Sequence, residues 1–125
     1  MTVGDEPTPG PQLDPGPPLT VPELDRELDR ELTRIADRLR VIGPRLAARA
    51  TPESLAALAR LRAALQRLAD LAAAADGRPL RTVPILDAHA LADQLLVLGH
   101  DAGAPHDVAV LRAARHIIAD LRATL

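Results

Sequence analysis

Apolar residues recur at helical spacing in four stretches of the chain, and no stretch alternates in the way a β-strand does. The best-bounded stretch runs from Thr51 to Gly77. Thr51 can cap the first free amides, Pro52 suits the first helical turn, and Gly77 can close a helix in the left-handed conformation. Two neighbouring apolar rows lie between these ends: Leu58, Leu61, Leu65, Leu68 and Ala72, and Ala57, Ala64, Leu71 and Ala75. The pattern predicts a helix that contacts more than one neighbour, because the two rows together are wider than a single packing seam.

An earlier helix is predicted to begin at Thr20, because Thr20 and Glu23 have the spacing of a capping box. Its apolar residues form a narrow stripe of the coiled-coil kind: Leu24, Leu28, Leu32, Ile35, Leu39, Ile42 and Leu46. Gly43 and Pro44 interrupt this stripe, and a proline inside a helix removes one backbone hydrogen bond. Because Leu46 keeps the stripe in phase, the pattern favours a kink near Gly43, with the reversal of the chain placed near Ala50.

Two further helices are predicted after a loop that contains glycine and proline. The first runs from about Val83 to Leu98, with Thr82 as its cap. Gly99 to Pro105 is predicted to form a turn, and the last helix runs from Pro105 to near the end of the sequence. The core row of this last helix is Leu111, Ala114, Ile118, Leu121 and Leu125. Four amphipathic helices joined by short turns predict an all-α fold.

Residues 1–19 differ from the rest of the chain, because they hold six prolines and three acidic residues but no basic residue. Proline blocks helix formation, and little apolar surface is available here to offset the entropy of ordering. We therefore predict a disordered Pro-rich tail at residues 1–19 and an antiparallel four-helix bundle at residues 20–125. A proline-motif ligand for an adaptor domain is the alternative interpretation of the tail.

The composition restricts the classes of function. The chain has 125 residues, which suggests one domain, and it has no aromatic residue and no cysteine. The core must then be aliphatic, and thiolate chemistry and cysteine metal sites are excluded. A net charge of −2 gives no general attraction to nucleic acid or to anionic membranes. The apolar runs are too short for a membrane span and no secretory signal is present, so a cytoplasmic location is expected. All basic residues are arginine, which indicates a GC-rich, bacterial coding bias.

Histidine and aspartate residues supply the one candidate metal set. His89, Asp93 and His100 share a stripe of the third predicted helix, and His116 and Asp120 repeat the four-residue spacing on the last helix. Neutral imidazole and carboxylate on adjacent turns can converge on one ion, so a metal-binding bundle is an alternative function. Metal sites in bundles point into the core, however, whereas these residues lie off the core rows. The pattern favours solvated His–Asp pairs, and we expect no cofactor.

No residue set favours an enzyme. Ser54 is the only serine and belongs to the first turn of its helix, where local hydrogen bonding is its expected role. The chain has no lysine or tyrosine to act as a base, and its glycines form no phosphate-binding loop.

A row of arginines on the first helix gives a second alternative, a nucleic-acid accessory protein that contacts phosphates. The row consists of Arg34, Arg38, Arg45 and Arg49. Glu27 and Glu31 begin the same flank, and no aromatic residue can stack on bases. The pattern therefore favours a solvated charged face and no nucleic-acid partner.

The third predicted helix has an apolar row beyond its core row. Leu86, Ala90 and Val97 lie on nearly the opposite side of that helix, with Leu96 on one flank. Either the helix is buried all round or part of this row is exposed, and exposed apolar rows often mark interfaces. Because surplus apolar surface accompanies the absence of a catalytic set, the predicted function is a non-enzymatic interaction or regulatory module. It would bind a protein partner, or a second copy of itself, through apolar helix faces.

Overall fold

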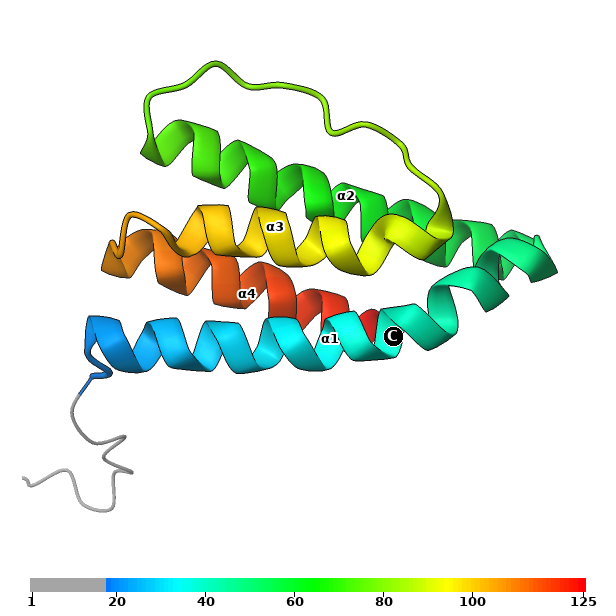
Figure 1. The fold of residues 1–125 in the computed structure, drawn as a ribbon, viewed down its shortest axis with the longest axis horizontal. Helices are drawn as coiled ribbons and strands as arrows, with labels where there is room; N and C mark the ends of the chain where they lie inside the picture. Colours follow the sequence, from blue (N-terminus) through cyan, green and yellow to red (C-terminus); the bar gives the residue numbers. More distant parts are fainter. Residues whose placement is uncertain (1–17) are drawn as a thin grey trace, which may run out of the picture.

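The computed structural model describes residues 18–125, which fold into a bundle of four α-helices (Figure 1). The elements in chain order are α1 (Val21–Arg49), α2 (Pro52–Ala75), a short 3-10 helix η1 (Ala88–Ala90), α3 (Leu91–Gly103) and α4 (Val108–Thr124). The predicted all-α four-helix fold is thereby confirmed. The disorder predicted for the tail concerns residues that lie outside the described part, except for residues 18 and 19. Leu19 is half-buried against the core.

Capping side chains at the N-terminal ends of α1 and α2 fix where these two helices begin. The Thr20 hydroxyl accepts the backbone N–H of Glu23 at 3.3 Å, and the Glu23 carboxylate accepts the backbone N–H of Thr20 at 3.0 Å. This reciprocal pair is the predicted capping box, and the N–H of Thr20 lowers the pKa of Glu23. Thr51 caps α2 by accepting the backbone N–H of Ser54 at 3.1 Å. Beyond the end of α2, Gly77 has a φ of 67°, which is the expected left-handed conformation.

The first helix continues through Gly43 and Pro44 without a break, which confirms the predicted kink over the alternative of a full reversal. Its last turns change direction in Figure 1. Gly43 is buried at this bend, and a methyl group there would lie 3.1 Å from the carbonyl oxygen of Ala88. The bend therefore fits α1 closely against η1, the element that leads into α3.

The predicted bounds of the third helix are wrong at both ends. Its start at Val83 is replaced by an extended segment, and Asp87, in place of Thr82, caps η1 by accepting the backbone N–H of His89. The helix also continues through Gly99, where a turn was expected, and ends at Gly103. The last helix begins at Val108, three residues later than expected, because the Asp107 carboxylate accepts the N–H groups of residues 109 and 110.

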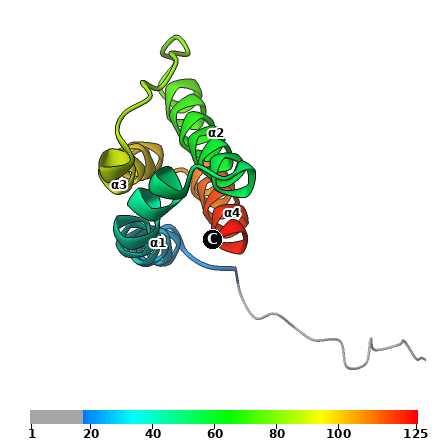
Figure 2. The same cartoon turned by 90° about the vertical axis from the view of Figure 1, so that its right-hand side faces the viewer.

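Residues 76–87, here called the connector, run along the length of the bundle between α2 and α3 (Figure 1). Because the chain returns to the starting end of α2 before α3 begins, α2 and α3 run in the same direction. The helices α1 and α4 run in the other direction. The bundle viewed along its axis (Figure 2) places α1 beside α3 and α2 beside α4.

The core is built from aliphatic side chains of all four helices. Its largest fully buried members are Leu24, Leu28, Leu32, Leu39, Leu61, Leu68, Leu91, Leu95, Leu111 and Ile118. The helices α1 and α3 approach each other closely at Gly99, because a methyl group there would lie 2.5 Å from a terminal carbon of Leu32. Among residues 18–125, no helix combines the length and the apolar character that crossing a bilayer requires.

Candidate functional site: an apolar groove beside α3

The connector and α3 enclose an open, mainly apolar groove with a volume of about 480 Å³. One wall is the stretch of the connector around Pro84 and Leu86, and the other is the side of α3 that carries Val97. Ala69 of α2 also lines the groove, and its short side chain leaves the space open. The remaining lining residues are Arg81, Thr82, Val83, Ala90, Asp93, Gln94 and Leu98. The groove is therefore a joint product of α2, the connector and α3.

Two glutamine side chains hold the connector in its extended form. Gln66 of α2 accepts the backbone N–H of Val83 at 2.8 Å and donates to the backbone carbonyl of Arg81 at 2.9 Å. Gln94 of α3 donates to the carbonyl of Pro84 at 3.0 Å. These bonds replace the helical hydrogen bonds that the sequence predicted for this stretch. They also explain how a segment without regular secondary structure forms a defined wall.

Large apolar side chains are exposed along this groove. Leu86 is 43% exposed and Val97 is 59% exposed. Two further exposed residues, Leu80 and Ile85, belong to the same connector. Four of the seven exposed large hydrophobic residues in the described part of the chain thus fall on the connector and the outer side of α3. Such a concentration is typical of an interaction surface, whereas single exposed apolar residues carry no such meaning.

The two walls carry opposite charges. Arg81 lies on the connector wall and Asp93 on the α3 wall. Asp93 forms a 3.7 Å ion pair with Arg40 of α1, yet 79% of its side chain remains exposed. Within residues 18–125, Arg81 takes part in no ion pair. Both charges are therefore accessible to a molecule that enters the groove.

Three of the four residues predicted to form an interaction surface lie together in the groove: Leu86, Ala90 and Val97. These three residues were expected on one helix, but they lie on three different elements. Leu86 belongs to the connector and Ala90 to η1, and only Val97 lies on α3. The fourth residue, Leu96, is half-buried against the core and does not line the groove. The periodicity thus picked out three residues that line one groove, but it placed them on a single helix, whereas they lie on the connector, η1 and α3.

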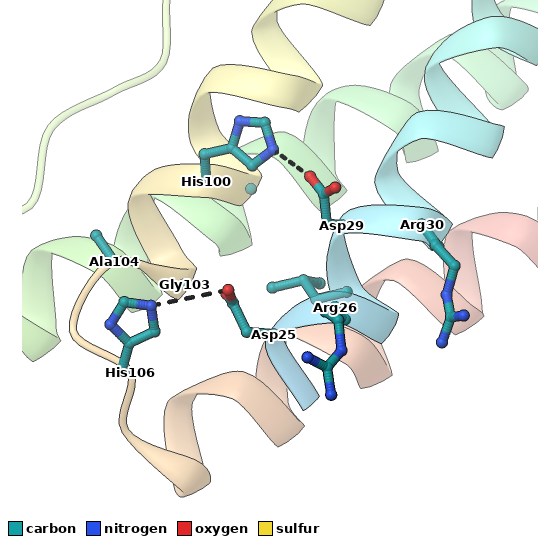
Figure 3. Close-up of a pocket in the computed structure, with 10 residues that line it drawn as sticks. Asp25, Arg26, Asp29, Arg30, His100, Gly103, Ala104 and His106 are labelled. Carbon is teal, nitrogen blue, oxygen red and sulfur yellow. Dashed lines mark hydrogen bonds and ion pairs between the residues drawn. The ribbon is translucent and has the colours of Figure 1, made fainter. Parts of the chain in front are cut away.

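A second pocket of about 460 Å³, with acidic, arginine and histidine side chains among its lining, lies between the first half of α1 and the end of α3 (Figure 3). Two histidines reach across to α1 in it. The Nε2 atom of His100 lies 2.9 Å from a carboxylate oxygen of Asp29, and the Nε2 atom of His106 lies 3.8 Å from one of Asp25. The sequence analysis missed both pairs, because each joins residues about 70 or more positions apart.

The proposed metal set is spread over the molecule. His89 is an exposed residue of η1, and Asp93 pairs with Arg40 of α1 instead of with a histidine. His100 faces Asp29, while His116 lies 3.7 Å from Asp120 on α4. Within residues 18–125, no three histidine or acidic side chains are grouped closely enough to hold a metal ion. The five candidates therefore do not form one site.

Three of the five remaining candidates, Arg34, Arg38 and Ser54, contact other groups of the protein. Arg34 contacts Glu31 at 3.5 Å, and Arg38 donates to the backbone carbonyl of Leu125 at 2.7 Å, whereas Arg45 and Arg49 are exposed. The Ser54 side chain is buried and accepts a hydrogen bond from the Thr51 hydroxyl at 2.9 Å, so it belongs to the start of α2.

Comparisons of the chain with protein-family models, with curated proteins and with solved structures find no significant match.

Proposed function

We propose that the protein is a non-enzymatic interaction module, which binds protein through the apolar groove between the connector and α3. The observation that carries this proposal is the exposure of Leu86 and Val97 on the connector and α3 sides of one groove. Burying exposed aliphatic side chains against a partner is favourable by about 25 cal/mol per Å² of apolar surface. A groove with defined walls further limits which partner surfaces fit.

The geometry supports this function over the two alternatives. A metal-binding bundle needs ligands that converge, and the five candidate residues lie on η1, α3 and α4 with separate partners. A phosphate-binding row needs free guanidinium groups along its length, and two of the four, Arg34 and Arg38, contact Glu31 and the backbone carbonyl of Leu125. The groove, in contrast, presents its apolar side chains without any covering element among residues 18–125.

The decisive experiment places a photoreactive amino acid at position 97 and irradiates the cells that produce the protein. We expect a covalent adduct with another polypeptide, because the side chain at this position projects into the contact. The matched control carries the same photoreactive residue at position 41. Val41 is 54% exposed, close to the exposure of Val97, but it lies on α1 outside the groove.

The adduct mass also tells which polypeptide is bound, since a second copy adds 13.3 kDa. An adduct at position 97 no more abundant than that at position 41 would overturn the proposal, because the groove would then be no more occupied than ordinary surface.

A further inference from the structure

We infer that the protein has a binding site for a small aliphatic carboxylate in a smaller pocket, which lies between α2 and the connector. This pocket has a volume of about 200 Å³. Its lining shares Thr82, Val83 and Pro84 with the groove, but its other wall is α2, and none of its lining residues belongs to α3. The inference is independent of the proposed function, because it concerns a small molecule and a different cavity.

The walls of this smaller pocket are mainly apolar. Leu65 of α2 is buried, Val83 is half-buried, and Pro84 and Ile85 are exposed. Ile85 is the most exposed large apolar residue in the described part of the chain, at 77%. A ligand with an aliphatic chain would remove this apolar surface from water. Sites for drug-sized molecules measure about 300–1,000 Å³, so this pocket suits only a short chain.

The charge of the smaller pocket comes from Arg62 of α2, because its lining contains no other charged residue. Within residues 18–125, Arg62 takes part in no ion pair. One terminal nitrogen donates to the backbone carbonyl of Leu86 at 3.3 Å. Its Nε atom is the one buried side-chain nitrogen or oxygen in the described part of the chain that has no hydrogen-bond partner. The guanidinium group therefore has N–H donors that the protein does not pair.

These features together favour a carboxylate over other small ligands. A planar carboxylate can accept two neighbouring N–H groups of one guanidinium group. A phosphate group carries more charge, and its sites gather several cations or backbone N–H groups, whereas one arginine lines this pocket. An uncharged aliphatic molecule would leave the guanidinium group unpaired beside its apolar chain. A carboxylate on a short aliphatic chain complements both Arg62 and the apolar walls.

Titration of the isotope-labelled full chain with isovalerate, followed through its backbone amide NMR signals, tests the site. Isovalerate is ionised at about pH 7 and has a short branched chain. We expect signal shifts concentrated at residues 62–66 and 82–86, with a dissociation constant on the order of 1 mM, because so small a ligand makes few contacts. Isovaleramide has nearly the same shape without the charge and should bind about tenfold more weakly or worse. Acetate keeps the charge without the chain and should also bind more weakly than isovalerate.

Two variants separate the role of Arg62 from a purely structural one. Arg62→Gln removes the charge but keeps an amide donor that can serve the carbonyl of Leu86. It should weaken isovalerate binding about tenfold or more while leaving the weak binding of isovaleramide unchanged. The matched control is Arg60→Gln, because Arg60 is an exposed arginine of the same helix that does not line the pocket. This control should bind isovalerate as the wild type does.

The absence of shifts at residues 62–66 and 82–86 with about 20 mM isovalerate would overturn the inference. Equal affinities of the wild type for isovalerate and isovaleramide would overturn it as well, because the charge would then play no part. Unchanged isovalerate binding by a folded Arg62→Gln variant would also overturn it. The comparison of acid with amide uses the wild-type protein, so it decides the question even if the variant does not fold. Crosslinking at position 97 tests the proposed function separately, and its outcome does not depend on this titration.

Discussion

The two sides of α3 differ in how closely they are packed. Towards α1, Gly99 leaves so little space that a single added methyl group would lie 2.5 Å from Leu32. Towards the connector, the same helix borders a groove of about 480 Å³ and exposes Val97. On the α1 side, the residue is a glycine, whose side chain is a single hydrogen atom, and this allows the two helices to come close together. On the groove side, the branched apolar side chain of Val97 remains exposed to solvent.

This difference predicts that the two sides of α3 contribute differently to the stability of the bundle. On the α1 side, Leu32 is fully buried against Gly99, and this close packing sets how α3 lies in the bundle. The groove side contributes apolar surface that the described part of the chain does not cover. An exposed groove is a liability for solubility unless a partner covers it, so its presence on a well-packed bundle favours an interaction role. The predictions below test whether the two sides behave in these different ways.

The largest contrast is expected between glutamate at position 95 and glutamate at position 97. Leu95 is fully buried and Val97 is exposed, although only one residue separates them. Leu95→Glu places an unpaired carboxylate in the core, which costs several kcal/mol out of the roughly 5–15 kcal/mol that stabilises a domain. Val97→Glu should change the unfolding free energy by no more than about 0.5 kcal/mol. Circular dichroism during urea unfolding measures both, and equal losses would contradict the contrast between the two sides.

The next largest effect is expected from Gly99→Ala on the closely packed side. The added methyl group meets Leu32, which is fully buried and has little freedom to move away. Overpacking costs about 1–3 kcal/mol, while alanine gains roughly 1 kcal/mol over glycine inside a helix. We therefore expect a net loss of up to about 2 kcal/mol in the unfolding free energy.

Gly103→Ala is the matched control for that variant. A methyl group there would have its nearest contact at 3.3 Å, with Leu28, so the control should be close to neutral. Combining Gly99→Ala with Leu32→Ala should make the first change less harmful than it is alone, because the clashing atoms are then absent. Additive losses would show that the two residues do not compete for the same space.

The parts of the fold that were predicted correctly are fixed by residues close together in the chain. Thr20 and Glu23 form their capping box within one helical turn, and Thr51 likewise caps α2 from an adjacent position. The predictions that were wrong concern residues whose structure depends on contacts with residues far away in the sequence. The sequence predicts a turn that begins at Gly99, but Gly99 is a packing residue inside α3 whose neighbour Leu32 lies on another helix. The residues around Thr82 have the local form of a helix start, and hydrogen bonds from Gln66 hold them extended instead.

The candidate site was predictable to the same limited extent. Helical periodicity identified Leu86, Ala90 and Val97 as surplus apolar residues, and all three line the groove. It did not reveal that the groove needs the connector as a wall, since that wall depends on side chains of two other elements. Nothing local indicates the contact of His100 with Asp29 either, because 71 positions separate the two residues.

An intermediate effect is expected when the connector loses its support. Gln66→Leu keeps most of the side-chain volume but removes the hydrogen bonds to Val83 and Arg81. The lost bonds should lower the unfolding free energy by about 1 kcal/mol. Hydrogen exchange of the backbone amides at residues 81–86 should accelerate, while exchange in α3 stays unchanged. Equal acceleration in both would mean that the connector and α3 open as one unit, and that the two sides of α3 are not independent.

The smallest effect is expected from the ion pair on the α1 side of α3. His100 and Asp29 are 2.9 Å apart, but their side chains are 57% and 63% exposed, so solvent screens the attraction. Asp29→Asn should therefore change the unfolding free energy by no more than about 0.5 kcal/mol, far less than Gly99→Ala at the neighbouring position. Raising the salt concentration from about 0.05 to about 1 M should change the difference between wild type and variant by even less, because little attraction remains to be screened.

A larger loss for Asp29→Asn than for Gly99→Ala would reverse the explanation of this side of the helix. It would mean that the cross-helix charge pair, and not the close approach at Gly99, holds α3 against α1. The pair lies at the edge of the contact, whereas Leu32 is fully buried beside Gly99, so the structure favours packing as the cause. Measuring both variants in the same salt series separates the two causes, because packing between apolar groups does not weaken with screening as a charge pair does.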